Sequence, residues 1–289
     1  MAYYEKQGNL TVIRGFSKFE LSLDKTFDCG QTFLWDKKEG IWYGALNNRL
    51  VMLKQYDIDR QESAILTNVE VSEIESIINF LNLDMDYTSE VKKLNLTNFA
   101  YIAYENGKGI HILRQDLFET MVQFLMSQCN SMGNIKNIVN KLRAKYGTPL
   151  SGEMGGTKVE TYTFPSLDTL ASIDSKELYN SFIECSMGFR ASYLAQMIKT
   201  LKTHPEMLKN IANSDYDNAM KQLKSFNGIG NKVANCICLF SKHCLDSFPI
   251  DRHIERIIDN EFGGYLDIKS LGNIAGVIQQ YLYYYYAFD

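Results

Sequence analysis

The spacing of apolar residues changes along this chain, and that change constrains its fold more than any other feature. Between residues 9 and 55, short apolar runs alternate with polar residues and are separated by glycines and an Asn-Asn pair, which is typical of antiparallel strands. The runs are 10–13, 19–23, 32–35, 41–43 and 50–53. Residues 70–83 have helical spacing, and nearly all of the chain after residue 110 keeps it. The sequence therefore predicts an α+β fold.

We expect two domains, an N-terminal antiparallel sheet domain with helices at 1–108 and a helical domain at 109–289. The glycine-containing stretch 147–166 is predicted to be a long connection. Apolar runs are too short to cross a membrane, and the first residues have neither a basic start nor an apolar stretch. We therefore expect a protein that is not secreted and that is cytoplasmic, as in a bacterium, or nuclear.

Composition excludes a disordered chain but leaves the ligand class open. Hydrophobic residues make up 45% and charged residues 22%, which are globular values. The net charge of -4 argues mildly against a dedicated nucleic-acid binder, although backbone amides can hold phosphates whatever the net charge. The six cysteines have no zinc-site spacing and are expected to be reduced thiols.

The segment from residue 223 to residue 257 carries the strongest chemical signature. A helix is predicted to end near Phe226, followed by the turn Gly228-Ile-Gly230 and a second helix from about Asn231. We expect both glycines to adopt positive φ and to let another molecule approach closely. The amides that open the second helix, through Val233, would then form a phosphate site.

A carboxylate follows this hairpin at a defined distance. Asp251 comes two residues after Pro249 and directly before an apolar helical run, so we expect it to be the N-cap of a third helix. An N-cap aspartate alone is common, but the hairpin together with Pro-x-Asp resembles the helix-hairpin-helix superfamily of base-excision DNA glycosylases. That resemblance implies a TBP-like N-terminal sheet domain and an all-α helix-hairpin-helix glycosylase domain.

The resemblance also implies the chemistry. It makes Lys232 the nucleophile that attacks the deoxyribose C1′ and forms a Schiff base, a residue found in the members that also act as lyases. It makes Asp251 the carboxylate that stabilises positive charge on the sugar. The enzyme would then be a bifunctional DNA N-glycosylase and lyase at apurinic or apyrimidinic sites.

A second run resembles the 8-oxoguanine DNA glycosylases within this superfamily. Gly30-Gln-Thr-Phe-Leu-Trp35 is similar to that family's Gly-Gln-Ser-Phe-x-Trp run, whose glycine carbonyl accepts the N7 hydrogen of the oxidised base. The resemblance thus implies that Gly30 tells 8-oxoguanine from guanine, whose N7 is an acceptor. Cys236 lies one helical turn after Lys232 and is expected to face the same pocket.

Other roles follow from the same resemblance. Asn130 and Arg190 would fill the space left by the flipped base, and Phe189 would be the wedge. His253 would contact a phosphate, and Phe288 would stack on the base, where the family has a Gln and a Phe. The stretch 129–134 lacks the family's cytosine-reading arginine, so we expect relaxed selectivity for cytosine opposite the lesion.

We expect no required cofactor and a monomer that acts on double-stranded DNA containing 8-oxoguanine. The four histidines have no metal-ligand spacing, and the absence of cysteines after Cys244 argues against an iron–sulfur cluster. Backbone carbonyls of Lys224, Phe226 and Ile229 would hold a structural monovalent cation.

Two alternatives stay open. One is a related glycosylase for another damaged purine, against which Lys232 argues because the alkyl-purine members lack this lysine. The other is a non-catalytic DNA-binding hairpin module, against which the spacing of Lys232 and Asp251 argues.

Overall fold

The computed structural model describes residues 2–288, which form two compact units that interleave along the chain. Unit 1 contains Met1–Gln31, Lys54–Arg114 and Cys238–Asp289, and unit 2 contains Thr32–Leu53 and Gln115–Ile237. The sequence instead predicts two consecutive segments that meet at residue 108. The α+β class is confirmed. No helix within residues 2–288 combines the length and the apolar character that crossing a membrane requires.

Unit 1 contains an antiparallel group of strands and a set of helices. Strand β2 (Leu10–Phe16) pairs on one side with β1 (Tyr3–Gln7) and on the other with β6 (Ser63–Thr67). Val12, Ile13 and Ile65 are fully buried. The helices are α1 (Leu23–Asp28), η1 (Val71–Glu73), α2 (Ile74–Phe80), α3 (Tyr87–Val91), α4 (Asn98–Gly107), α13 (Arg252–Glu261), η2 (Ile268–Ile274) and α14 (Ala275–Phe288).

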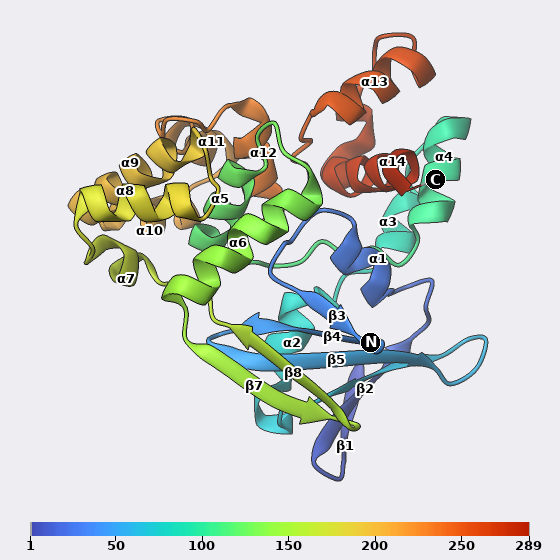
Figure 1. Cartoon of the computed structure of the whole chain (residues 1–289). Helices are drawn as coiled ribbons and strands as arrows, with labels where there is room; N and C mark the ends of the chain where they lie inside the picture. The colour runs from blue at the N-terminus through green and yellow to red at the C-terminus, as the bar shows by residue number, and fades with distance from the viewer. Residues whose placement is uncertain (1, 289) are drawn as a thin grey trace. The chain divides into compact units, whose positions relative to one another are not determined.

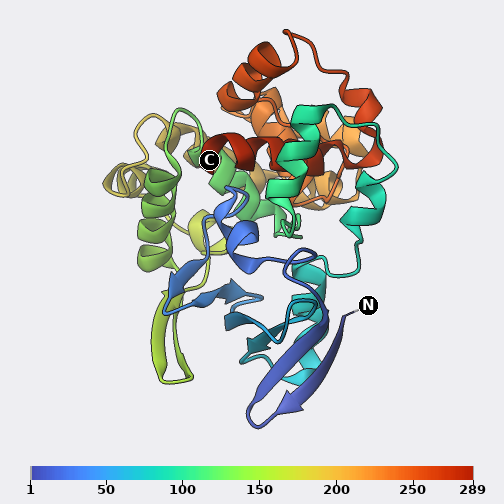
Figure 2. The ribbon, with the colours of Figure 1, turned by 90° about the vertical axis from the view of Figure 1, so that its right-hand side faces the viewer.

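Helices α4 and α14 lie side by side in unit 1, as both views show (Figures 1 and 2). Gly107 permits this contact, because a Cβ at that position would lie 2.4 Å from Cδ1 of Tyr281. The Tyr104 and Tyr281 rings then meet with centroids 5.6 Å apart. The aromatic tail of the chain is therefore packed against α4 at its start, and its side chains become more exposed toward Phe288.

Unit 2 contains a set of helices and several antiparallel strands. Strand β4 (Ile41–Leu46) pairs with β3 (Asp36–Lys38) and with β5 (Arg49–Asp57), inside which the division between the units falls. The complete strand order of this sheet is β1-β2-β6-β5-β4-β3. The helices are α5 (Leu117–Met126), α6 (Met132–Tyr146), α7 (Leu167–Ala171), α8 (Ser175–Glu184), α9 (Arg190–Thr203), α10 (Glu206–Asn213), α11 (Tyr216–Leu223) and α12 (Asn231–Phe240), which ends in unit 1.

The stretch 147–166, expected to be a long connection, is largely a β-hairpin, so the second half of the chain is not wholly helical. Strand β7 (Pro149–Met154) pairs with β8 (Thr157–Tyr162) across a Gly-Gly turn. Thr157, Val159 and Thr161 are buried and alternate with exposed residues. This alternation and the Gly-Gly turn are hairpin signals, so the prediction was wrong about a pattern that the sequence contains.

Two predicted strands, at 19–23 and 32–35, are absent. Ser22 caps the short helix α1 by accepting a hydrogen bond from the Lys25 amide at 3.4 Å. This local helix signal outweighs the alternation of apolar and polar residues that predicted a strand at 19–23. Residues 32–35 are all buried and irregular. Side chains replace a strand ladder there, since Gln123 Oε1 accepts from the Phe33 amide at 2.7 Å and the Leu34 carbonyl accepts from Arg143 at 3.1 Å.

Arg143 organises the interior of unit 2. Its side chain is 2% exposed and leaves α6 toward the irregular segment and β8. It donates to the Leu34 carbonyl, to the Tyr162 carbonyl at 3.0 Å and to Thr161 Oγ1 at 2.7 Å. A guanidinium offers five donors in a fixed plane, which matches this set of acceptors. One buried side chain thus ties three segments together.

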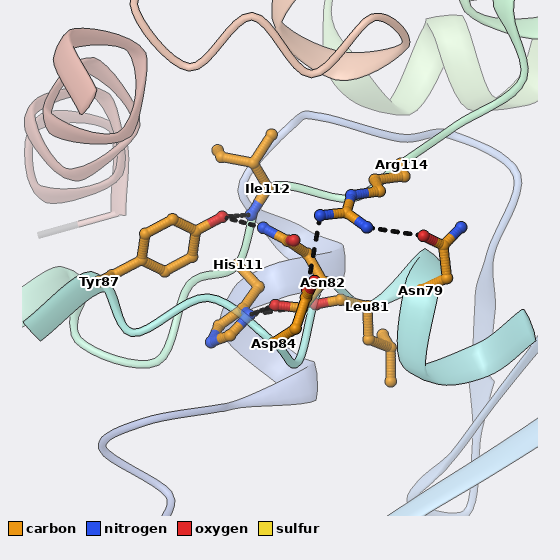
Figure 3. A network of polar contacts seen from close by, with 8 residues as sticks. All are labelled: Asn79, Leu81, Asn82, Asp84, Tyr87, His111, Ile112 and Arg114. Carbon is orange, nitrogen blue, oxygen red and sulfur yellow. Dashed lines mark hydrogen bonds and ion pairs between the residues drawn. The ribbon is translucent and has the colours of Figure 1, made fainter. Parts of the chain in front are cut away.

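His111 is the corresponding buried polar centre of unit 1 (Figure 3). Its Nδ1 lies 3.0 Å from the Asn82 carbonyl and 3.1 Å from the Leu81 carbonyl, and its Nε2 lies 2.7 Å from the Glu20 carbonyl. Tyr87 packs its ring on the imidazole, and its hydroxyl accepts from the Ile112 amide at 3.2 Å. Burial lowers the pKa of His111, and the carbonyl contacts oppose that effect.

Replacement of His111 by Gln should therefore change how stability depends on pH. The folded histidine binds its proton at lower pH than the unfolded one, so unfolding takes up a proton below about pH 6.5 and stability falls as pH falls. His111→Gln should reduce this slope by at most about 1.4 kcal/mol per pH unit, as measured by urea unfolding between about pH 7 and about pH 5. His204→Gln, at an exposed histidine, is the matched control. Equal slopes in the wild type and His111→Gln would contradict the prediction.

Candidate active site

Helices α11 and α12 form the predicted hairpin within unit 2. The first ends at Leu223 and the second begins at Asn231. Gly228 has a φ of 86°, and a Cβ there would lie 2.5 Å from Cδ2 of Tyr193. Any larger residue would be strained in this conformation and would displace that ring. The expectation of positive φ at Gly228 is confirmed.

The expectation of positive φ at Gly230 is wrong. This glycine is outside the described positive-φ residues, and its carbonyl accepts the Ala234 amide at 2.9 Å. It therefore occupies the position that precedes a helix, where ordinary negative φ is normal. A Cβ at Gly230 would meet no atom of the chain within 4 Å. The glycine consequently leaves room for an external group and relieves no internal clash.

The start of α12 has the properties of an anion site. The amides of Asn231, Lys232 and Val233 precede the first intrahelical donor, which is the Ala234 amide. The Val233 side chain is buried, so its main chain is the part that could meet a ligand. The positive end of the helix dipole adds to these amides, and a phosphate suits both.

Lys232 is held by the end of α5 within unit 2. Its Nζ donates to Ser127 Oγ at 3.2 Å and lies 5.5 Å from the centroid of the Phe124 ring. The Ser127 hydroxyl donates to the Phe124 carbonyl at 2.8 Å, so its lone pairs can accept from the lysine. Cys236 is buried one helical turn after Lys232 on α12. Ser127 and Phe124 were not found from the sequence, since no local pattern marks a contact made across the fold.

Asp251 in unit 1 is the N-cap of α13, as predicted. Its Oδ1 accepts from the amides of His253 and Ile254, both at 3.0 Å. The described residues provide no hydrogen bond to Oδ2. The helix start thus holds one carboxylate oxygen, while the second oxygen is left for another partner.

Aromatic residues of α14 surround His253 within unit 1. The imidazole meets the Tyr283 ring at 5.6 Å and the Tyr286 ring at 5.9 Å. Phe288 lies further along, is 44% exposed and stacks on Tyr284 at 5.1 Å. Tyr283 follows the buried Gln279 by one helical turn, which places a Gln and an aromatic ring on one helix face. The sequence reasoning did not identify Gln279 or Tyr283, because the run of tyrosines concealed the register.

Gly30 lies in unit 1 after α1 and not between strands as expected. Its φ is 81°, and the neighbouring residues are tightly anchored. Gln31 is fully buried, donates to the carbonyls of Thr26 at 2.8 Å and His111 at 2.7 Å, and accepts from the Leu113 amide at 2.8 Å. Burial raises the pKa of Cys29 to about 12, so this thiol is a neutral packing group. The Gln31 side chain therefore fixes the position of the Gly30 peptide.

Three further candidates lie in unit 2. Phe189 is 53% exposed at the start of α9, and the Arg190 guanidinium lies over its ring at 4.5 Å. Arg190 is buried and donates to the carbonyls of Gln128 and Cys129, the latter at 3.1 Å. Asn130 donates to the Met126 carbonyl at 3.2 Å. Phe189 is free to insert into a partner, whereas Arg190 would first have to leave its carbonyls.

The candidate residues are divided between the two units. Unit 2 contains Asn130, Phe189, Arg190, Gly228, Gly230, Lys232, Val233 and Cys236, and unit 1 contains Gly30, Asp251, His253 and Phe288. Within residues 2–288, no group of three or more His, Cys, Asp or Glu residues is arranged to hold a metal ion. Of the carbonyls expected to hold a cation, that of Phe226 accepts the Ile229 amide at 3.1 Å.

Comparisons with known proteins show which family this chain resembles. The family described as 8-oxoguanine DNA glycosylase, N-terminal domain, matches residues 15–121. The N-glycosylase/DNA lyase OGG1 of Arabidopsis thaliana is 32% identical over 272 residues, covering 89% of this chain and 72% of that protein. The apo-form of the Clostridium acetobutylicum 8-oxoguanine glycosylase/lyase has a TM-score of 0.83 at 29% identity and covers 99% of this chain and 98% of that one.

A third relative is similar over the same share of both chains. MBOgg1, solved in complex with a low-affinity DNA ligand, has a TM-score of 0.87 at 28% identity over 99% of this chain and 98% of that one. These similarities run through both units and include the hairpin and the Pro-x-Asp segment. The chain therefore belongs to the 8-oxoguanine DNA glycosylase family of N-glycosylase/DNA lyases.

Proposed function

We propose that this chain removes 8-oxoguanine from double-stranded DNA and then nicks the strand, with Lys232 as nucleophile. The observation that carries the proposal is the position of Lys232, on the first turn of the hairpin's second helix and fixed by Ser127 and Phe124. A relative from Clostridium acetobutylicum, similar over 98% of this chain, was solved with double-stranded DNA containing cytosine opposite 8-oxoguanine. Base-excision repair is thus the activity that geometry and family support together.

The reaction begins with attack of the neutral Lys232 amine on C1′ of the deoxyribose. The N-glycosidic bond breaks, its electron pair leaves with the base, and the base takes up a proton. Positive charge develops on the sugar, and the Asp251 carboxylate stabilises it. Loss of the amine proton and opening of the ring give a Schiff base. Removal of a C2′ proton then breaks the C3′–O bond and releases the 3′ phosphate.

Phosphate binding would rest on backbone amides more than on side-chain charge. Gly230 and the first amides of α12, through Val233, would follow one strand, while His253 contacts a phosphate near the lesion. The carbonyls of Lys224, Phe226 and Ile229 would hold a monovalent cation beside this strand, and no other cofactor is required. The enzyme would act as a monomer on DNA, in the cytoplasm or the nucleus.

Recognition of the damaged base would combine a main-chain acceptor with packing. The Gly30 carbonyl would accept the N7 hydrogen of 8-oxoguanine and repel the N7 lone pair of guanine. Cys236 would contribute to the pocket beside Lys232. Phe189 would enter the base stack, and Asn130 and Arg190 would occupy the vacated space, the latter after releasing its carbonyl partners. Selectivity for cytosine opposite the lesion would be relaxed.

Measurements of base release and strand cleavage distinguish the two alternative functions from the proposed one. A glycosylase for alkylated purines would release its base without strand cleavage and without a trapped adduct. A non-catalytic module would bind DNA and release no base. Lys232 and Asp251 have defined positions that a binding module does not need, which favours catalysis.

The first test uses Lys232→Gln. With a duplex that contains 8-oxoguanine opposite cytosine and borohydride, the wild type should form a covalent adduct, because only a Schiff base is reduced to a stable link. Lys232→Gln should form none, while Lys221→Gln, at an exposed lysine of α11, should trap normally. Adduct formation by a folded Lys232→Gln variant would assign the nucleophile to another residue.

A second test separates the two tasks of Asp251. Asp251→Asn keeps an oxygen that can cap α13 but removes the charge, so the rate of base release should fall about 100-fold or more with little change in Tm. Asp251→Ala should lose the same activity and also about 1 kcal/mol of stability. Single-turnover excision and thermal unfolding measure the two effects. An active Asp251→Asn enzyme would exclude a catalytic charge at this position.

A third test decides which aromatic residue meets the base. If Tyr283 stacks on it, Tyr283→Ala should weaken binding to the lesion duplex by about 1–3 kcal/mol and leave binding to undamaged duplex unchanged. Phe288→Ala is the comparison, since this ring lies at the exposed end of α14. A fluorescence-anisotropy titration measures both. The reverse order of effects would assign stacking to Phe288.

A further inference from the structure

Cys238 and Cys244 form a pair of touching thiols in unit 1. Cys238 lies in the last part of α12 and is fully buried, whereas Cys244 lies in the following loop and is partly buried. His243, with a φ of 58°, reverses the chain, and the Cys244 amide donates to the Cys238 carbonyl at 3.1 Å. The two thiols are in hydrogen-bond contact with each other.

The loop that carries Cys244 is held in place. The Ser247 amide donates to the Cys244 carbonyl at 2.9 Å, and the Gly276 amide donates to the Leu245 carbonyl at 2.7 Å. A Cβ at Gly276 would lie 2.3 Å from the Ser247 carbonyl oxygen, so α14 begins in direct contact with this loop. The two sulfurs therefore stay together in the folded protein. A main-chain hydrogen bond between the two residues is also compatible with the Cα separation of about 4.4–6.8 Å that disulfides require.

The two thiols differ in reactivity. The hydrogen bond with Cys238 lowers the pKa of Cys244, with a further contribution from Lys242, while burial and Asp246 oppose it. The same hydrogen bond raises the pKa of Cys238. A peroxide reacts with an accessible thiolate, so Cys244 has the properties of the attacking residue and Cys238 those of the resolving one.

We propose that Cys244 and Cys238 are a peroxide-reactive pair that closes to a disulfide. The Cys244 thiolate attacks one peroxide oxygen, the O–O bond breaks, and the departing hydroxide is protonated to water, which leaves a sulfenic acid on Cys244. The Cys238 sulfur then attacks the Cys244 sulfur, loses its proton and displaces a second water. Two thiols are oxidised to one disulfide, and one peroxide is reduced to two waters. The proposal stands independently of the glycosylase chemistry.

Peptide mapping of peroxide-treated full-length protein tests this directly. After free thiols are blocked, trypsin cleaves behind Lys242, between the two cysteines, so a disulfide would join peptide 233–242 to peptide 243–252. Fragmentation must locate the link at Cys238, because peptide 233–242 also contains Cys236. We expect this linked pair to form at low peroxide, to disappear with dithiothreitol, and to raise Tm by on the order of 5 °C.

Variants distinguish the pair from non-specific oxidation. Cys244→Ser should abolish the link, and Cys238→Ser should leave Cys244 to proceed to the sulfinic acid, which dithiothreitol does not reverse. Cys129→Ser, at an exposed cysteine, is the matched control and should form the link normally. The proposal fails if the wild type shows no link, if Cys236 or Cys129 is the partner, or if Cys244 is over-oxidised at the same rate with and without Cys238.

Discussion

The close contact between the hairpin turn and the Tyr193 ring is the constraint on which the candidate chemistry depends. Only glycine fits at position 228, because φ is positive there and the Tyr193 ring fills the space beside it. The turn therefore has one conformation, and α12 begins at a defined residue. The start of α12 determines which amides point outward and the direction in which the Lys232 side chain leaves the helix. Ser127 and Phe124 then fix the lysine from α5. A single steric requirement thus determines where the first amides of α12 and the Lys232 amine lie relative to each other within unit 2.

Asp251 shows how one interaction can serve folding and chemistry. The hydrogen bonds from the amides of His253 and Ile254 start α13 and also hold one oxygen of the carboxylate that the proposed reaction places beside the sugar. Since both hydrogen bonds go to Oδ1, capping of the helix leaves Oδ2 without a part in the cap. Capping of α13 and the role proposed for Asp251 in the reaction are therefore compatible at this residue.

The sequence was sufficient to predict those parts of the site whose conformation is determined by neighbouring residues in the chain. The start of α12 and the cap of α13 follow from turn glycines and from Pro-x-Asp, so Lys232 and Asp251 could be found before the fold was known. The surroundings of Gly30 could not, because Gln31 and Gln123 satisfy backbone groups that a strand would have paired, and these partners are about eighty to ninety residues away. The hairpin at 149–162 was readable from its alternation, but its glycines suggested a loop.

The acidic charge of the chain is consistent with binding to DNA when the contacts are considered one by one. Backbone amides at a helix start carry partial positive charge in any protein, whatever its net charge of -4 implies for the whole surface. Gly230 exposes these amides because it has no side chain, and burial of Val233 keeps its side chain out of the way. Contacts between such amides and phosphates do not depend on base sequence. A repair enzyme requires this independence, since a lesion occurs in every sequence context. In the proposed function, discrimination falls to a separate group, the Gly30 carbonyl, which Gln31 anchors within unit 1.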